Sequence, residues 1–133
     1  MPLKGAYPKH GHVLYCDFTR GFVEPEMVKR RPVVVISPSS THGRRLCTVA
    51  PISSTPPSDP KLYHYLLGEP PIDGRPLGEE AWVKCDMLYT VSFDRLDKPH
   101  RRTRAGREYY MPRITGEDWN KIMEAVSEYL KLT

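Results

Sequence analysis

The stretch KRRPVVVIS, residues 29–37, decides the fold of this chain. Three basic residues run into a proline and then into four β-branched apolar residues. A continuous β-branched run closed by serine and proline is typical of a strand that is buried on both faces, so residues 32–37 predict the central strand of a sheet. The cations before it leave two interpretations open, a solvated strand end or a site that holds an anion.

The rest of the chain reads as short strands followed by one helix. Strands are expected over residues 12–18, 46–52, 61–67, 81–86 and 87–96. Loops are expected over 19–31, over 98–107 with brief pairing at 108–111, and over the long proline-rich segment 53–80. Residues 115–131 predict a C-terminal helix with Thr115 as N-cap. Its apolar stripe is expected to face the sheet and consists of Trp119, Ile122, Met123, Val126, Tyr129 and Leu130.

This order predicts an α+β fold that is mainly β, a small twisted antiparallel sheet or barrel capped by the C-terminal amphipathic helix. With 133 residues the chain is expected to form one domain, 1–133. No apolar run approaches the ~18 residues of a membrane span, and the N-terminus lacks the pattern of a signal peptide. We therefore expect a cytoplasmic protein without a membrane partner.

Metal and cofactor chemistry is not expected. The three cysteines, Cys16, Cys47 and Cys85, each lie in an apolar run and are expected to be buried thiols. The five histidines lie in separate segments and complete no zinc site. The chain has no phosphate-binding glycine loop and no nucleophile elbow.

Positive charge is segregated along the chain. The net charge is +4, and residues 29–45 hold five cations and no acid. Residues 98–113 hold six cations and one acid. Such clusters favour a polyanionic partner, with a solvated charged loop as the alternative for each. Candidate contacts are Lys29, Arg30, Arg44, Arg45, Arg101 and Arg102.

Three polar residues at strand positions are candidates for chemistry. Arg31 precedes Pro32, which extends its backbone, so its guanidinium can hold a phosphate from a rigid strand end. Ser53 can donate a hydrogen bond to a phosphate oxygen. Asp86 lies in an apolar run and needs a partner, for which an arginine is the natural choice. The alternatives are a surface arginine, a turn-forming serine and a buried ion pair.

Four segments, in this order, resemble the PemK/MazF family of toxins from type II toxin–antitoxin systems. They are GHVLYCDF (11–18), RRPVVVISP (30–38), TVAPISS (48–54) and WVKCDMLYTVSFDRL (82–96). The resemblance implies a twisted antiparallel sheet close to an SH3-like barrel, a C-terminal helix and a homodimer. It also implies metal-independent cleavage of single-stranded RNA, in which the 2′-hydroxyl attacks the adjacent phosphate and leaves a 2′,3′-cyclic phosphate.

The resemblance assigns roles to individual residues. Arg31 stands at the family's arginine before proline and would stabilise the phosphorane and act as acid. Ser53 stands where many members have threonine, and Asp86 matches an acid that has been assigned a catalytic role in part of the family. Lys84 stands where an arginine would give a bidentate phosphate contact. Glu24, in the preceding loop, is a secondary candidate for the base.

The sequence thus predicts a sequence-specific endoribonuclease toxin, neutralised by an antitoxin whose acidic disordered tail fits the basic groove. Four tyrosines beside basic residues, Tyr63, Tyr65, Tyr109 and Tyr110, are candidates for base stacking or for core packing. Two rivals stay open. One is a non-catalytic toxin-fold protein that binds a protein target such as DNA gyrase, and the other is a degenerate family member that only binds RNA.

Overall fold

The computed structural model describes residues 3, 7–69, 71–72 and 80–132. Its strands are β1 (Val13–Asp17), β2 (Arg30–Val35), β3 (Leu46–Ser53), β4 (His64–Leu66), β5 (Trp82–Lys84), β6 (Tyr89–Ser92), β7 (Leu96–Asp97), β8 (His100–Thr103) and β9 (Gly106–Tyr109). Two short 3-10 helices, η1 (Ser39–Thr41) and η2 (Phe93–Arg95), precede β3 and β7. The α-helix α1 spans Gly116–Leu130.

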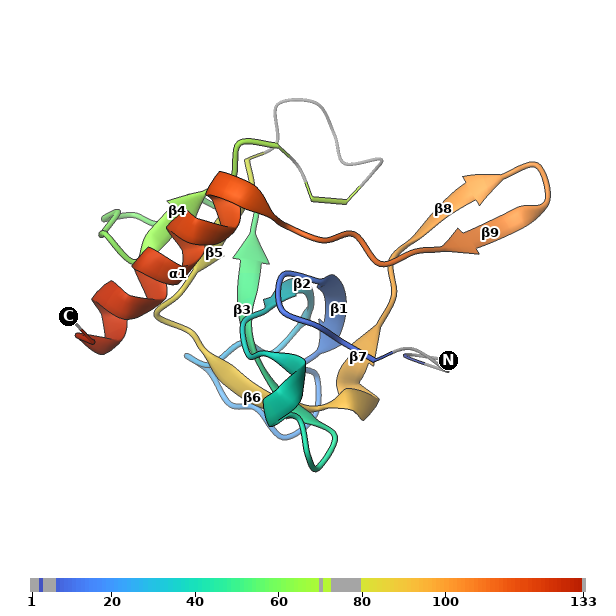
Figure 1. Ribbon diagram of the computed structural model, residues 1–133, viewed down its shortest axis with the longest axis horizontal. Coiled ribbons are helices and arrows are strands. Elements are labelled where there is room, and N and C mark those ends of the chain that lie inside the picture. Colours follow the sequence, from blue (N-terminus) through green and yellow to red (C-terminus); the bar gives the residue numbers. More distant parts are fainter. Residues whose placement is uncertain (1–2, 4–6, 70, 73–79, 133) are drawn as a thin grey trace.

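The main sheet is antiparallel and open, in the order β4-β5-β3-β2-β1-β7, and β6 also pairs with β3 (Figure 1). This architecture of a twisted antiparallel sheet and one C-terminal helix confirms the predicted fold class. The sheet does not close into a barrel along this path. Strand β3 joins the two parts of the sheet, because its first half pairs with β6 and its end pairs with β5.

The core lies on both faces of β2, as the β-branched run predicts. Val33, Val34 and Val35 are fully buried. One face packs under α1, where Val34 joins a cluster that includes Ile52 and Ile122. The other face carries a second cluster of buried residues, among them Leu14, Phe18, Val33, Val35, Val49 and Phe93. The strand therefore forms a rigid centre from which its charged first residues extend.

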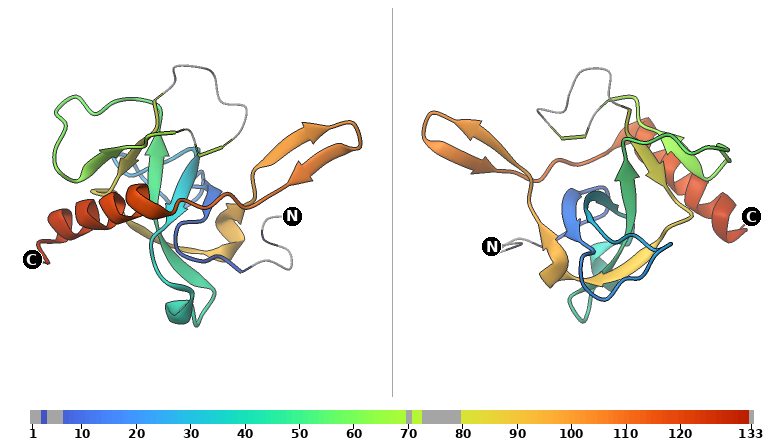
Figure 2. Two further views of the ribbon diagram at one scale, coloured as in Figure 1. Left: turned by 45° about the horizontal axis from the view of Figure 1, so that its top comes forward. Right: turned by 180° about the vertical axis from the view of Figure 1, so that it is seen from behind.

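The C-terminal helix buries a narrower stripe than the sequence predicts. Ile122, Ala125 and Val126 are its buried residues, whereas Met123 and Leu130 are 37% and 48% exposed. The C-terminal end of α1 reaches past the sheet (Figures 1 and 2), which leaves its last residues exposed. Thr115 occupies the N-cap position, but its side chain makes no capping hydrogen bond. No helix within the described residues is long and apolar enough to cross a membrane.

Residues 98–107 are not the predicted loop. Most of them form, with 108 and 109, the antiparallel hairpin β8–β9, which projects away from the main sheet (Figures 1 and 2). Gly106, at φ +116°, follows the two-residue turn and begins β9. The sequence did not indicate this hairpin because its eight strand residues are all exposed and show no apolar alternation. Within the proline-rich segment 53–80, β4 forms where a strand was expected, and residues 70 and 73–79 lie outside the described part.

Candidate functional site

The register of the sheet brings Arg31 and Ser53 to one face. Strands β2 and β3 pair Val33 with Pro51 and Val35 with Val49. This ladder ends at Val33 and Pro51, and Arg31 and Ser53 each stand two residues beyond it, so the alternation of the two strands places both on the face of Val33 and Pro51. Ser53 itself pairs with Trp82 of β5. The two candidates, which are 22 positions apart in the sequence, therefore lie beyond the same end of one strand pair.

Arg31 is a half-buried residue whose guanidinium is available to a ligand. Its neighbour on β1 is the buried Cys16. Among the described residues, Arg31 forms no ion pair or hydrogen bond. A cation that is partly removed from water and has no counter-charge is an unfavourable arrangement in an isolated protein. The binding of a phosphate therefore stabilises such a cation more than it stabilises a cation that already has a partner.

Arg30, by contrast, is already engaged on the other face of β2. One guanidinium nitrogen lies 3.4 Å from a carboxylate oxygen of Asp97, and the guanidinium carbon lies 4.3 Å from the centroid of the Tyr15 ring. The alternation of a strand points consecutive residues to opposite faces. The pair of arginines that the sequence presents as one basic cluster is thus divided between the two sides of the sheet.

Asp86 lies in a turn and not within a strand, which corrects the sequence prediction. Val83 pairs with Ile52 and Tyr89 with Val49, so residues 85–87 are extra to the ladder beside β3. The predicted arginine partner is also wrong. The partner is His64, whose Nε2 lies 3.4 Å from Oδ1 of Asp86 without hydrogen-bond geometry.

The tautomer of His64 follows from its second nitrogen. The backbone N–H of Lys61 donates a hydrogen bond to Nδ1 of His64 at 3.0 Å. Nδ1 is therefore an acceptor, and the proton of the neutral ring lies on Nε2, toward Asp86. Sequence reasoning missed His64. The only signal was its place between Tyr63 and Tyr65. The rings of both tyrosines pack against the core, so the alternation of a strand points the side chain of residue 64 outward.

Lys84 joins the same group. It pairs in register with His64, and it shares a face of β5 with Trp82, the partner of Ser53. Lys84 is half-buried and has no ion pair within the described part of the chain. Ser53 Oγ accepts a hydrogen bond from the N–H of Thr55 at 3.1 Å, which makes Ser53 also the turn residue of the alternative interpretation. One face of the sheet thus carries a hydroxyl, two cations and a His–Asp pair.

Other candidates lie elsewhere. Glu24 is exposed in the loop before β2, and Lys29 is exposed at its end. Arg44 and Arg45 precede β3, whose first residue, Leu46, is seven residues or about 23 Å from Ser53 at the other end. The guanidinium of Arg45 stacks on Phe93 at 5.1 Å. Arg101 and Arg102 lie on the β8–β9 hairpin.

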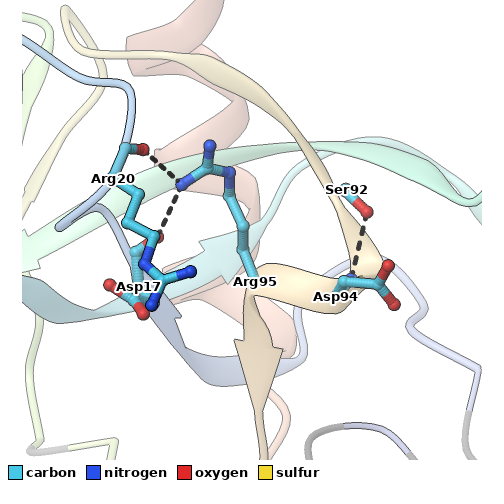
Figure 3. A pocket seen from close by; sticks show the side chains of 5 residues that line it. All are labelled: Asp17, Arg20, Ser92, Asp94 and Arg95. Atoms are coloured by element: carbon cyan, nitrogen blue, oxygen red, sulfur yellow. Dashed lines mark hydrogen bonds between the residues drawn. The ribbon is translucent and has the colours of Figure 1, made fainter.

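A cavity of about 380 Å³ lies near the start of the loop that leads to Arg31, and Asp17, Arg20, Ser92, Asp94 and Arg95 line it (Figure 3). Arg95 donates hydrogen bonds to the carbonyl oxygens of Asp17 and Arg20 at 3.0 and 2.8 Å, and it stacks on Phe22 at 4.7 Å. At the other end of this loop, the N–H of Met27 donates to the Tyr89 hydroxyl at 2.8 Å. These contacts fix the loop and hence the entry into β2.

The three cysteine thiols take no part in this chemistry. Cys16, Cys47 and Cys85 are free and buried, as the sequence predicts. Burial raises the pKa of each thiol to about 12, so all three stay protonated near neutral pH. In the described residues, no group of three or more histidine, cysteine or acidic side chains is arranged to hold a metal ion.

A small twisted antiparallel sheet with a C-terminal helix is the fold of the MazF-type toxins. The family model of the PemK-like, MazF-like toxins of type II toxin–antitoxin systems matches residues 9–130. The chain therefore belongs to the PemK/MazF family of toxins.

Known proteins agree with this assignment. An uncharacterized protein of Haemophilus influenzae is 33% identical over 108 residues, which cover 72% of this chain and 73% of the relative. An endoribonuclease from a mycobacterial species, solved in complex with its cognate antitoxin, has a TM-score of 0.65 at 20% identity over 95% of this chain and 97% of that chain. MazF from Deinococcus radiodurans has a TM-score of 0.64 at 19% identity over 94% and 97%. At these identities the solved structures support the fold.

Proposed function

We propose that this toxin is an endoribonuclease that cleaves single-stranded RNA without a metal ion, at the face of the sheet that carries Arg31 and Ser53. The observation that carries the proposal is Arg31, which is half-buried, has no side-chain partner within the described chain and lies just beyond the end of the β2–β3 ladder, on the same face as Ser53. A phosphodiester supplies the missing charge. The guanidinium is planar and presents several donors, so it suits a phosphorane better than an ammonium group does.

The reaction needs a base and charge stabilisation. Asp86 accepts the proton of the 2′-hydroxyl, the 2′-oxygen bonds to the adjacent phosphorus, and the bond from phosphorus to the 5′-oxygen breaks. The 5′-oxygen takes a proton from a water molecule, which in turn takes the proton held by Asp86, and the products are a 2′,3′-cyclic phosphate and a 5′-hydroxyl. Arg31 and Lys84 balance the negative charge that builds on the phosphorane, and Ser53 orients a phosphate oxygen.

His64 acts as a positioning residue for this base. Its Nε2–H faces Asp86, and its Nδ1 is tied to the backbone of Lys61, so the imidazole holds one orientation. An imidazole that stays beside Asp86 in one orientation limits how far the carboxylate turns when the substrate binds. Glu24 is exposed in the loop before β2 and remains a secondary candidate for the base.

The partners proposed for this site follow from family and charge. The solved mycobacterial endoribonuclease was crystallised with its cognate antitoxin. For this chain we propose an antitoxin whose acidic segment covers the same cations, and a homodimer that acts on RNA in the cytoplasm. An acidic chain that folds on binding competes with RNA because both need Arg31 and Lys84.

The test is cleavage of a long single-stranded RNA by the purified protein in EDTA. We expect discrete fragments that end in 2′,3′-cyclic phosphate, and loss of cleavage in Arg31→Ala while circular dichroism shows an intact fold. Retention of RNA without cutting would identify the RNA-binding rival, and neither cutting nor retention would favour the protein-binding rival. A folded Arg31→Ala protein that cuts at the wild-type rate would overturn the assignment of the site.

A further inference from the structure

The β8–β9 hairpin, here called the arm (residues 98–110), stands apart from the core. All eight residues of its two strands are exposed, and it pairs only with itself among the described strands (Figures 1 and 2). An isolated two-stranded ribbon is marginally stable in water. The strand residues of the arm belong to neither buried cluster, so core packing does not account for their sequence.

One face of the arm is electrostatically satisfied. Arg101 lies opposite Glu108, with its Nε 3.0 Å from a carboxylate oxygen. The guanidinium of Arg101 also lies 4.2 Å from the centroid of the Tyr110 ring. These contacts link the two strands on this face, and they leave Arg101 committed to its own ribbon.

The opposite face has an excess of positive charge. Arg102 lies directly opposite Arg107, and neither forms an ion pair or hydrogen bond within the described residues. Like charges that face each other across a strand pair destabilise a ribbon. The next pair on this face is His100 and Tyr109, whose ring centroids are 5.5 Å apart. An arginine pair and a ring pair thus lie about 7 Å apart along one exposed ribbon face.

We infer that this face of the arm is a second binding site for single-stranded RNA, separate from the cleavage face. A phosphate lies between Arg102 and Arg107 and removes their repulsion, and a base stacks on Tyr109. Grooves for single strands combine these two features, cations for the backbone and aromatic rings for the bases. An acidic protein segment would contact the arginines and leave the aromatic rings without a role. The presence of arginines and rings on the same face therefore favours RNA.

The arm is placed to extend the proposed cleavage site. Both of its ends lie along β1, where Asp97 pairs with Tyr15 and the N–H of Val13 donates to the carbonyl of Pro112. β1 is the neighbour of β2, which carries Arg31. An RNA bound at the cleavage face can therefore continue onto the arm, and the arm's role as a grip on flanking nucleotides rests on the proposed function.

The test is binding of a 2′-O-methyl RNA oligonucleotide, which cannot be cleaved by 2′-oxygen attack. R102Q/R107Q removes one phosphate contact, so the salt dependence of log K against log salt should fall by about 0.7 and the affinity by about fivefold at 0.1 M salt. Tyr109→Ala should weaken binding about 5- to 150-fold without changing the slope. R20Q/K121Q removes the same charge outside the arm and should leave the slope unchanged.

The melting temperature of R102Q/R107Q gives an independent test, because it should stay or rise while the affinity for RNA falls. R102Q/R107Q removes the repulsion between two facing arginines, so its melting temperature should equal or exceed that of the wild type. A fall in melting temperature together with weaker binding would mean that the arginines hold the arm together, and the inference would be wrong.

Other outcomes separate this inference from the proposed function. Wild-type affinity and slope in R102Q/R107Q would overturn the arm site while leaving cleavage untouched. If the protein never cuts RNA but still binds RNA through the arm, the arm site would be supported and the proposed nuclease function would be refuted. Loss of binding to a poly-glutamate peptide without loss of binding to RNA would assign the arm to an acidic protein partner instead.

Discussion

Neighbouring arginines on β2 should give opposite phenotypes when each is replaced by glutamine. Arg30 and Arg31 are adjacent in sequence, equal in charge and on opposite faces of the strand. Arg30 is bound to Asp97 and Tyr15, whereas Arg31 has no partner in the described chain. Arg30→Gln should therefore lower stability and spare cleavage, and Arg31→Gln should abolish cleavage and spare stability.

The magnitudes follow from the contacts. Arg30 loses an exposed ion pair of about 0.2–1 kcal/mol and a cation–π contact of about 0.5–1 kcal/mol. Its side chain is 50% exposed, so we expect about 1 kcal/mol in total, or roughly 3–5 °C in Tm. Arg31→Gln removes an uncompensated, half-buried cation, so Tm should stay or rise. Its cleavage rate should fall about 10²- to 10³-fold, the usual effect of removing a donor that stabilises transition-state charge.

The assay measures thermal unfolding and single-turnover cleavage of one RNA for both variants. The two proteins have the same composition and net charge, so a general electrostatic effect on RNA binding changes both equally. Equal losses of cleavage would show that the arginines act as one basic patch and that the division between faces has no functional meaning. A clear loss of Tm in Arg31→Gln would show that Arg31 has a structural partner.

Three further results are expected. His64→Gln should lower kcat about tenfold or more with little change in KM, and it should add nothing in an Asp86→Asn background, since additive losses would show that the two residues act separately. Burial lowers the pKa of His42 below its ordinary value, so the unfolded chain binds this proton more readily, and stability is lost as the pH falls below about 6.5. Melting temperatures between pH 5 and 8 should show a shallower acid loss in His42→Gln than in the wild type. Tyr65→Phe removes the hydrogen bond from the Tyr65 hydroxyl to the Asp118 carboxylate, which joins β4 to α1, and should cost about 1.5–3 kcal/mol of unfolding free energy in urea titrations. Tyr63→Phe, which lacks such a bond in the described structure, should cost less.

The central strand and the helix were predictable because their patterns are local. Four consecutive β-branched residues admit few alternatives to a doubly buried strand, and the spacing of apolar residues from 119 to 130 indicates a helix. The sequence could predict that Arg31 and Ser53 share one face only to the extent that each stands near the end of a strand. Their register depends on how β2 and β3 align, which no local pattern contains.

His64 was not predictable for a related reason. Its contact with Asp86 spans 22 positions and depends on β4 pairing with β5 and on three extra residues after β5. A bulge of this kind leaves no apolar signature, because it takes residues out of the alternating ladder. The apolar run around Asp86 therefore indicated a strand where the chain turns.

The structure also divides the cations into those that have a partner within the protein and those that do not, a difference that the net charge does not show. Arg30, Arg45, Arg95 and Arg101 each lie over an aromatic ring of the chain itself. Those contacts satisfy the guanidinium within the protein and reduce its value to a polyanion. Arg31, Lys84, Arg102 and Arg107 have neither such a ring nor an acid among the described residues. A basic protein attracts polyanions through all of its charge at long range, but at contact distance only the unpaired cations gain a new partner without losing an old one. The affinity for RNA should therefore depend on the unpaired group far more than on the paired group, although the two carry equal charge.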